Sequence, residues 1–419
     1  MMNEVEKRVL ENVDLDGLLG YTSELIAIPS HGGAESAAQR NVAAKLGALG
    51  LDVDVWEIDF DELREHPDFS MSFEREEGLG VVGTLGGGED RDLILGGHID
   101  TVAPGDPGNW ETPALEADLR KGRLYGRGSV DMKGGLACAV YAVKAIIDSG
   151  LDLKGKVILE SVIGEEDGGC GTLATCLRGY TADAGIVMEP SGTVIAPEVA
   201  GAMSFRVTVP GRAAHACVRE EGVSAVEKFI ALHEGLRVLE RERNDRFHNP
   251  LYRRYSIPHA ISIGTVEGGQ WPGSVPEKVV FEGRMGVAVG EPEGDARREL
   301  EAKVAEVSNA DPWLRENPPK VEWVGYSFAS SRISVDHPIV ETLGGAYRDI
   351  AGREPGIEGM TYASDVRHLI NVGKTPTTVF GPGDVRVAHG PDEYVAVDEL
   401  ELTVKTLALT ILRYVGYAE

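Results

Sequence analysis

Histidine and carboxylate residues follow several apolar, strand-like runs of this sequence. They are His98 and Asp100 after 93–95, Glu165 and Glu166 after 157–159, Glu189 after 186–188 and His389 after 377–380, while Asp131 stands just before an apolar helical stretch. Because open α/β sheets place their sites at the carboxyl ends of strands, we expect these side chains to gather at one edge of a sheet. Crowded carboxylates repel one another unless a cation joins them. The pattern therefore predicts a metal site, and the number of carboxylates favours two ions.

The length and charge of the chain limit what the protein can be. A chain of 419 residues is too long for one ordinary core, so we expect two domains. The formal net charge of -27 argues against a nucleic acid or an anionic membrane surface as a partner, because binding phosphate groups needs basic patches. A small anionic substrate is still compatible with this charge where a local arginine outweighs the overall field.

Neither the cysteines nor the apolar runs indicate export or a membrane. The four cysteines, Cys138, Cys170, Cys176 and Cys217, complete no zinc-binding spacing, and we expect them to be thiols. The first residues are acidic and lack a long apolar stretch, and the sequence has no run of about 18 apolar residues. We therefore expect a cytoplasmic enzyme without a signal peptide or a transmembrane helix.

The order of strand-like and helical patterns changes along the chain. The two patterns alternate up to about Pro190, which is typical of an α/β domain. Between 202 and 324 the order becomes β-α-β-β-α-β, as in a ferredoxin-like module, and the α/β pattern resumes near Ile339. We expect the runs at 81–85 and 93–95 to be neighbouring strands joined by a glycine turn.

This order predicts the fold class. We expect an α/β catalytic domain with a central, mostly parallel sheet, interrupted by an inserted ferredoxin-like α+β domain. The predicted boundaries are 1–199 and 328–419 for the two catalytic parts and 200–327 for the insertion.

Five stretches of the chain together resemble one family of di-metal hydrolases. The stretches are GHIDTVAP at 97–104, LYGRGSVDMKGG at 124–135, GEE at 164–166, MEP at 188–190 and AHG at 388–390. The family includes acetylornithine deacetylase, succinyl-diaminopimelate desuccinylase, aminoacylase and glutamate carboxypeptidase. The resemblance covers nearly the whole chain, and it implies a homodimer that forms through the inserted domain.

The resemblance also implies roles for the residues of the predicted metal site. By this analogy Asp131 bridges two divalent ions, His98 and Glu189 complete one ion, and Glu166 and His389 complete the other. Zinc is the expected metal, and cobalt or manganese suits the same ligands. Glu165 resembles the general base that takes a proton from the water between the ions. Asp100 resembles the carboxylate that orients a liganding imidazole.

The inserted domain and a late loop supply further residues by analogy. His215 resembles the histidine that stabilises the oxyanion of the reaction in the partner subunit. Ser274 and Arg284 resemble the residues that hold a substrate carboxylate, although many family members have Asn at the position of Ser274. Thr361 and Ser364 lie in a stretch that resembles a loop of the substrate pocket.

The function implied by the resemblance is hydrolysis of a linear amide. We expect a small, carboxylate-bearing N-acyl amino acid as the substrate. Two alternatives use the same site: an exopeptidase such as a carboxypeptidase or dipeptidase, and an enzyme similar to formylaminopyrimidine deformylase. A catalytically inert metal-binding or ligand-binding protein is the rival from another class, and the presence of Glu165 argues against it.

Overall fold

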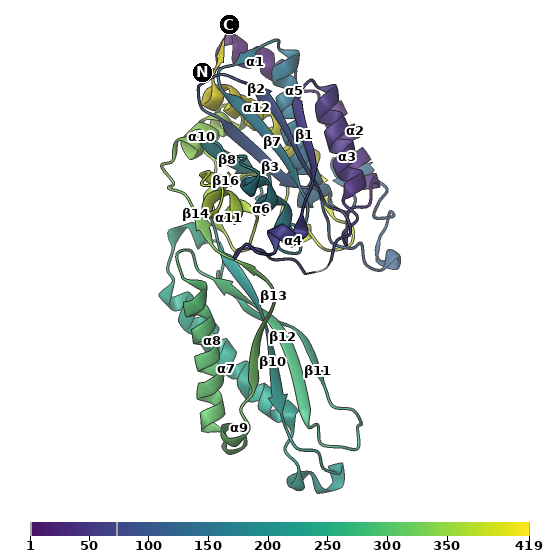
Figure 1. Ribbon diagram of the computed structural model, residues 1–419, viewed down its shortest axis with the longest axis vertical. Coiled ribbons are helices and arrows are strands. Elements are labelled where there is room, and N and C mark those ends of the chain that lie inside the picture. Colours follow the sequence, from purple (N-terminus) through teal and green to yellow (C-terminus); the bar gives the residue numbers. More distant parts are fainter. Residues whose placement is uncertain (1, 73, 419) are drawn as a thin grey trace. The chain divides into compact units, whose positions relative to one another are not determined.

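The fold is described from a computed structural model that covers residues 2–72 and 74–418 (Figure 1). The chain forms two compact units. Unit 1 contains the chain up to Glu198, Arg332–Gly359 and the part from Ser364 onward. Unit 2 contains Val199–Ser331 and Met360–Ala363. No helix among the described residues is long and apolar enough to cross a membrane.

A nine-stranded sheet forms the centre of unit 1. Its strands, in spatial order, are β1 (Asp52–Glu57), β2 (Leu79–Gly86), β7 (Lys156–Val162), β3 (Leu93–His98), β8 (Ala184–Val187), β16 (Thr377–Val379), β9 (Ile195–Val199) and β14 (Ser331–Arg332), with β15 (Ile357–Met360) paired to β9. The four central strands β7, β3, β8 and β16 are parallel to one another. The β1–β2, β2–β7 and β16–β9 pairs are antiparallel. The sheet is therefore mixed, and the predicted parallel arrangement holds only at its centre.

The predicted pairing of the runs at 81–85 and 93–95 is wrong. Strand β7 lies between β2 and β3 and pairs with both of them. The glycine-rich connection crosses the chain just before β7, where the amide of Asp90 donates to the Lys154 carbonyl at 3.1 Å. A Cβ on Gly88 would lie 1.8 Å from that carbonyl oxygen, so these glycines allow a close crossing rather than a hairpin turn.

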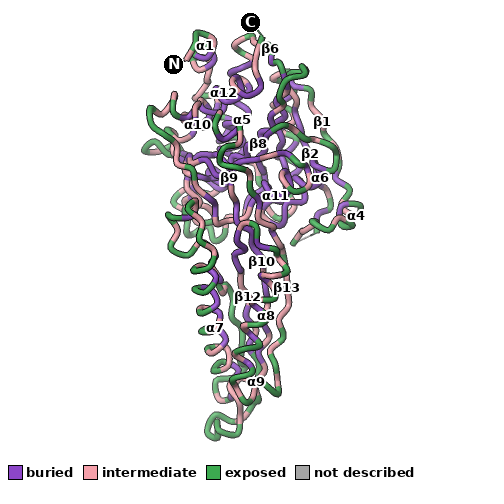
Figure 2. Tube along the Cα trace, turned by 90° about the vertical axis from the view of Figure 1, so that its left-hand side faces the viewer, coloured by how far each residue is buried: buried purple, intermediate pink, exposed green. Residues whose placement is uncertain are grey.

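Helices cover both sides of this sheet (Figure 1). They are α1 (Glu4–Glu11), α2 (Leu15–Ala27), α3 (Ser36–Ala48), α4 (Phe60–Leu63), α5 (Gly134–Asp148), α6 (Cys170–Leu177), α10 (Pro338–Ala351), α11 (Val366–Asn371) and α12 (Val397–Val415). Helix α5 and strand β8 are buried along nearly their whole length (Figure 2). Such all-round apolar elements form the interior of an α/β domain, as the sequence predicted for the stretch after Asp131.

Two small sheets complete unit 1, and the sequence analysis did not predict them. Strands β17 (Tyr394–Ala396), β5 (Arg123–Tyr125) and β4 (Asp118–Arg120) form one, and β18 (Tyr417–Ala418) pairs with β6 (Asp152–Leu153) in the other. With two or three residues each, these strands are too short to give a periodic hydrophobic pattern. The first sheet matters for the site, because β5 and β17 each adjoin a segment that carries a predicted ligand.

Unit 2 has the strand and helix order predicted for the insertion. It runs β10 (Gly201–Pro210), α7 (Ala225–Arg246), β11 (Ile261–Gly268), β12 (Lys278–Val287), α8 (Glu293–Ala310), α9 (Pro312–Glu316) and β13 (Lys320–Phe328). The sheet order is β11-β12-β10-β13 with antiparallel neighbours, which is the ferredoxin-like arrangement. Along β10 every second side chain is buried, and Phe205 packs edge-on against Phe281 in the core.

Candidate metal centre

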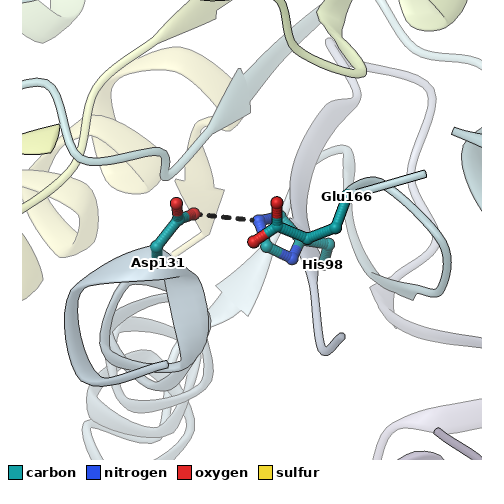
Figure 3. A group of neighbouring side chains, drawn as sticks. All are labelled: His98, Asp131 and Glu166. Carbon is teal, nitrogen blue, oxygen red and sulfur yellow. Dashed lines mark hydrogen bonds and ion pairs between the residues drawn. The ribbon is translucent and has the colours of Figure 1, made fainter. Parts of the chain in front are cut away.

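Asp131 lies between two histidines in unit 1. Its Oδ1 atom is 3.2 Å from Nε2 of His98, and its Oδ2 atom is 3.3 Å from Nε2 of His389. Figure 3 shows Asp131 directing one oxygen at His98, with the Glu166 carboxylate beside the imidazole ring. Because each carboxylate oxygen faces a different imidazole, Asp131 has the geometry of a bridging ligand.

The remaining predicted ligands lie next to these three residues. Nε2 of His389 is 3.1 Å from the Glu166 carboxylate, and Nε2 of His98 is 3.9 Å from Oε2 of Glu189. Two groups of side chains each bring three ligand atoms within 4.8 Å of one another: His98, Asp131 and Glu166, and His98, Glu165 and Glu189. The structure therefore brings together all five predicted ligands and the predicted base from widely separated parts of the chain.

Asp100 organises the segment that carries Glu165 and Glu166. Its Oδ1 atom accepts the Glu165 amide at 3.3 Å, and its Oδ2 atom accepts the Glu166 amide at 3.0 Å. The same carboxylate lies 3.6 Å from Nδ1 of His98, which also contacts the Asp100 carbonyl at 3.0 Å. These contacts leave Nε2 of His98 directed at Asp131, as a metal ligand requires.

Close packing around glycines positions these elements. A Cβ on Gly97 would lie 2.8 Å from Met132, directly after Asp131. A Cβ on Gly135 would lie 2.2 Å from the Met188 carbonyl, next to Glu189. The glycines thus let the start of α5 approach the ends of β3 and β8, so that Asp131 reaches the residues that follow those strands.

The histidines of the centre are surrounded by negative charge. Burial alone would lower the pKa of His98, but hydrogen bonds to Asp100 and Asp131 raise it well above its usual range. Hydrogen bonds to Asp131 and Glu166 raise the pKa of His389 to about 10. Burial disfavours the charged form of Asp131, yet its contacts with both histidines hold its pKa below the usual range. Without a metal, protons on the histidines therefore balance part of the carboxylate charge.

The other carboxylates show the same excess of negative charge. Burial raises the pKa of Glu189 to about 8. Burial, followed by the charge of Glu189, raises the pKa of Glu165 well above its usual range, and burial with the charge of Asp131 raises that of Glu166. Apart from the exposed His389, these side chains are buried or half-buried. A group of imidazoles and carboxylates that retains protons for want of other positive charge fits divalent cations, which would replace those protons.

The predicted residues of the insertion form two pairs in unit 2. His215 and Ser274 are bridged antiparallel partners, and the Val275 amide donates to the Ala214 carbonyl at 2.9 Å. The His215 imidazole is exposed, and its Nδ1 accepts the Cys217 amide at 3.2 Å. Arg284 on β12 donates from Nη2 to the Thr361 carbonyl at 3.3 Å.

Ser364 belongs to unit 1 rather than to the group around Arg284. It is buried, and its hydroxyl donates to Oε1 of Glu189 at 3.2 Å. This contact places Ser364 beside a predicted metal ligand, and its predicted role as a substrate contact stays a prediction. Thr361 and Ser364 are close in the sequence, but they belong to different units, because a boundary between the units falls after Ala363.

Two buried ion pairs next to the centre were missed by the sequence analysis. Arg127 pairs with Glu393 at 2.6 Å, and Arg75 pairs with Asp167 at 2.8 Å. Both pairs link segments far apart in the sequence, so no local spacing of residues predicts them. Arg127 lies in the stretch 124–135 and Asp167 directly follows Glu166, and this proximity to the motifs was the available signal.

Comparison with known proteins supports one family. Residues 94–413 match Peptidase family M20/M25/M40. The chain is 30% identical to N-formyl-4-amino-5-aminomethyl-2-methylpyrimidine deformylase of Halalkalibacterium halodurans over 98% of this chain and 97% of that protein. It is 28% identical to acetylornithine deacetylase of Aliivibrio fischeri over 80% of this chain and 84% of that protein.

Solved structures show the same fold. The di-peptidase Dug1p of Saccharomyces cerevisiae superposes with a TM-score of 0.77 at 15% identity, covering 99% of each chain. The YXEP protein of Bacillus subtilis, described as a dinuclear metal-binding peptidase of family M20, superposes with a TM-score of 0.61 at 15% identity, covering 96% of this chain and 98% of that one. With the family match, the whole-length relatives and a group of carboxylates and histidines suited to metal ions, the chain belongs to Peptidase family M20/M25/M40 and is a hydrolase of amide bonds.

Proposed function

We propose that this protein is a two-metal amidohydrolase that removes a small acyl group from an amine. The observation that carries the proposal is the position of the Asp131 carboxylate, with one oxygen 3.2 Å from His98 and the other 3.3 Å from His389. One carboxylate between two imidazoles, each with a further carboxylate beside it, is the donor set of a paired divalent site.

In this proposal His98 and Glu189 hold one ion, Glu166 and His389 hold the other, and Asp131 holds both. Zinc is the proposed metal, and cobalt and manganese suit the same oxygen and nitrogen donors. When bound, the ions would act as Lewis acids toward the amide carbonyl and make water more acidic. Asp100 keeps His98 and the 165–166 segment in place through its contacts with the imidazole and both amides.

Glu165 is the proposed general base. It is buried, and one of its oxygens lies within 4.8 Å of both His98 and Glu189. Its carboxylate would take a proton from the attacking water and give that proton to the nitrogen of the leaving amine. His215 of a second copy of the chain is proposed to donate a hydrogen bond to the carbonyl oxygen of the substrate as negative charge develops there.

We propose a carboxylate-bearing N-acyl amino acid as the substrate class, because of Arg284. Burial lowers the pKa of this guanidinium, and in the described part of the chain its hydrogen bond goes to the Thr361 carbonyl rather than to a carboxylate. A half-buried arginine without an acidic partner is suited to a bidentate contact with a substrate carboxylate. Thr361, whose carbonyl accepts from Arg284, is proposed to line the same pocket, and Ser274, which lies beside His215, is proposed as a separate substrate contact.

A second candidate substrate is an N-formyl aminopyrimidine. The similarity to the deformylase of Halalkalibacterium halodurans over 98% of this chain favours it. Such a substrate has no carboxylate, so Arg284 would have no anionic group to bind. The two candidates therefore differ in what they require of this residue.

A substrate panel with the wild type and Arg284→Ala separates the candidates. The panel contains N-acetyl, N-succinyl and N-formyl amino acids, a dipeptide and the N-formyl aminopyrimidine, each with enzyme reconstituted with Zn²⁺. Our proposal expects hydrolysis of an N-acyl amino acid and at least a tenfold higher KM for it in Arg284→Ala. Hydrolysis of the aminopyrimidine alone, with a KM that Arg284→Ala leaves unchanged, would support the second candidate. Failure to hydrolyse any amide would contradict the proposed function.

We also propose that the protein is a homodimer that forms through unit 2. Strand β11 is the terminal strand of its sheet, and Val266 on it is 51% exposed. On α7, Val226 and Ile230 lie one helical turn apart with 42% and 50% exposure. An edge strand and an exposed apolar helix face are surfaces that a second copy of the chain would cover. Light scattering with Ile230→Glu as the test variant should show a shift from dimer to monomer.

A cytoplasmic location is proposed on the state of the cysteines. Cys138, Cys170, Cys176 and Cys217 are all free thiols. Free thiols are typical of a reducing compartment.

A further inference from the structure

Glu393 joins the two segments that carry Asp131 and His389. Its side chain is 1% exposed. Its Oε1 atom accepts the amide of Val130 at 3.0 Å and that of Asp131 at 3.2 Å. Its own carbonyl accepts the amide of Gly126 at 2.9 Å. The side chain and the backbone of one residue therefore both hold the segment 126–131.

Arg127 holds the other oxygen of the same carboxylate. Its Nη1 atom donates to Oε2 of Glu393 at 2.6 Å, and the arginine is 2% exposed. The guanidinium also lies 5.2 Å from the ring centre of Trp110. A buried carboxylate so close to Asp131 needs a compensating charge, because two unpaired anions in a dry environment destabilise the fold.

The strands next to these residues fix the register of the contact. Strand β17 begins at Tyr394, directly after Glu393, and Tyr394 pairs with Tyr125 at the end of β5. Glu393 lies four residues after His389, whose backbone has a φ of 61°. The Glu393 carboxylate is therefore the point where the loop of His389 is tied to the loop of Asp131.

We propose that Glu393, held by Arg127, is a positioning residue for the metal pair. It fixes the Asp131 backbone relative to the His389 loop, so that the two oxygens of Asp131 face the two histidines. This inference rests on the proposed function, because it assigns Glu393 a task at the proposed metal ligands. Groups that orient metal ligands in this way typically contribute about 10–100-fold to metal affinity.

The test is Co²⁺ binding by the metal-free full-length protein. Calorimetry measures the affinity, and visible absorption measures the Co²⁺ spectrum. Glu393→Gln retains an oxygen for the two amides but gives Arg127 no charged partner. We expect it to bind at least one Co²⁺ about 10–100-fold more weakly than the wild type and to show an altered Co²⁺ spectrum. Its kcat should fall, while KM stays within about twofold, because Glu393 does not contact substrate.

Glu291→Gln is a matched control in unit 2. Glu291 makes the same kind of buried contact: it pairs with Arg243 at 2.7 Å and accepts the Ala288 amide at 2.9 Å. Both variants break a buried arginine–carboxylate pair, and both should lower the unfolding temperature. Only Glu393→Gln should change Co²⁺ affinity and the Co²⁺ spectrum.

Arg127→Lys provides a milder variant in case Glu393→Gln does not fold. Lysine keeps the positive charge but lacks the planar guanidinium, so a smaller loss of Co²⁺ affinity in the same direction is expected. The inference is overturned if the wild type binds two Co²⁺ and hydrolyses amides while these variants bind Co²⁺ unchanged. A wild type that binds no pair of ions, or hydrolyses no amide, contradicts the proposed function itself and the inference with it.

Discussion

At the scale of single residues, the side chains proposed to hold the metal ions differ from Glu165, which is proposed to move a proton. Asp131 contacts each of the two histidines directly. Glu165 belongs to a different group of possible ligand atoms from Asp131. Its carboxylate lies beside His98 and Glu189. Its amide is held by Asp100, so its backbone position does not depend on a metal ion. Loss of this carboxylate should therefore affect turnover more than metal binding.

Glu165→Gln tests that separation. We expect kcat to fall by about 10²–10⁴-fold, because glutamine cannot accept a proton, while metal content measured by atomic emission stays that of the wild type. Glu160→Gln is the matched control. Like Glu165, Glu160 is a buried glutamate, and it lies on β7. Burial raises the pKa of Glu160 to about 8, so glutamine resembles its neutral form. Equal activity losses in both variants would contradict the role of Glu165.

At the scale of elements, the centre depends on how closely helix α5 approaches the strand ends. The helix begins two residues after Met132, and Gly135 lies against the backbone carbonyl of Met188. Lys133 fixes the same region from the other side, since its Nζ donates to the carbonyls of Leu25 and Ile28 at 2.7 and 2.9 Å. The start of α5 is thus held between β8 and the end of α2.

Gly135→Ala should disturb this approach. The new Cβ would lie 2.2 Å from the Met188 carbonyl, so the helix must shift, and we expect a loss of about 1–3 kcal/mol in the free energy of unfolding. Urea titration measures this loss, and metal affinity should fall with it. Gly20→Ala in α2 is the control, because its Cβ would meet nothing within 4 Å and alanine favours a helix by about 1 kcal/mol. A stable Gly135→Ala variant with unchanged metal affinity would contradict the account.

The elements also show what the sequence predicts well. The helical stretch after Asp131, which is α5, and the strand–helix order of unit 2 follow from hydrophobic patterns and were confirmed. The position of β7 between β2 and β3 was missed, because strand order depends on contacts between distant segments. Glu393 was missed for the same reason, since it lies over 260 residues from the amides that it accepts. The gathering of the ligands was expected because His98, Glu166, Glu189 and His389 follow strand-like runs, and because the five motif stretches, one of which contains Asp131, resemble a di-metal family.

At the scale of the whole molecule, each unit has its own buried polar network. In unit 2, Arg243 is fully buried and pairs with Glu291. His259 lies nearby with its ring 6.0 Å from Phe247 and 5.7 Å from Tyr252. Burial and the charge of Arg243 lower the pKa of His259 to about 4, against the charge of Glu291. Protonation of His259 therefore opposes the folded state.

The stability of unit 2 should therefore fall at acidic pH. The folded pKa of His259, about 4, lies below the ordinary value of 6.5, so its contribution is present above pH 6.5 and is lost as the pH falls toward 4. A shift of this size corresponds to at most about 3 kcal/mol. Urea unfolding at pH 7 and pH 5 should show a smaller loss in His259→Phe than in the wild type. An identical loss in both proteins would mean that His259 does not titrate in this range.

The central claim is that Asp131 lies between two metal ions. A crystal structure of the Zn²⁺-loaded protein, with diffraction data collected on both sides of the zinc absorption edge, tests it most directly. We predict two anomalous peaks about 3.5–4 Å apart, one beside His98 and Glu189 and the other beside Glu166 and His389, with the Asp131 carboxylate between them. A single peak, or peaks that the Asp131 carboxylate does not touch, would contradict the account.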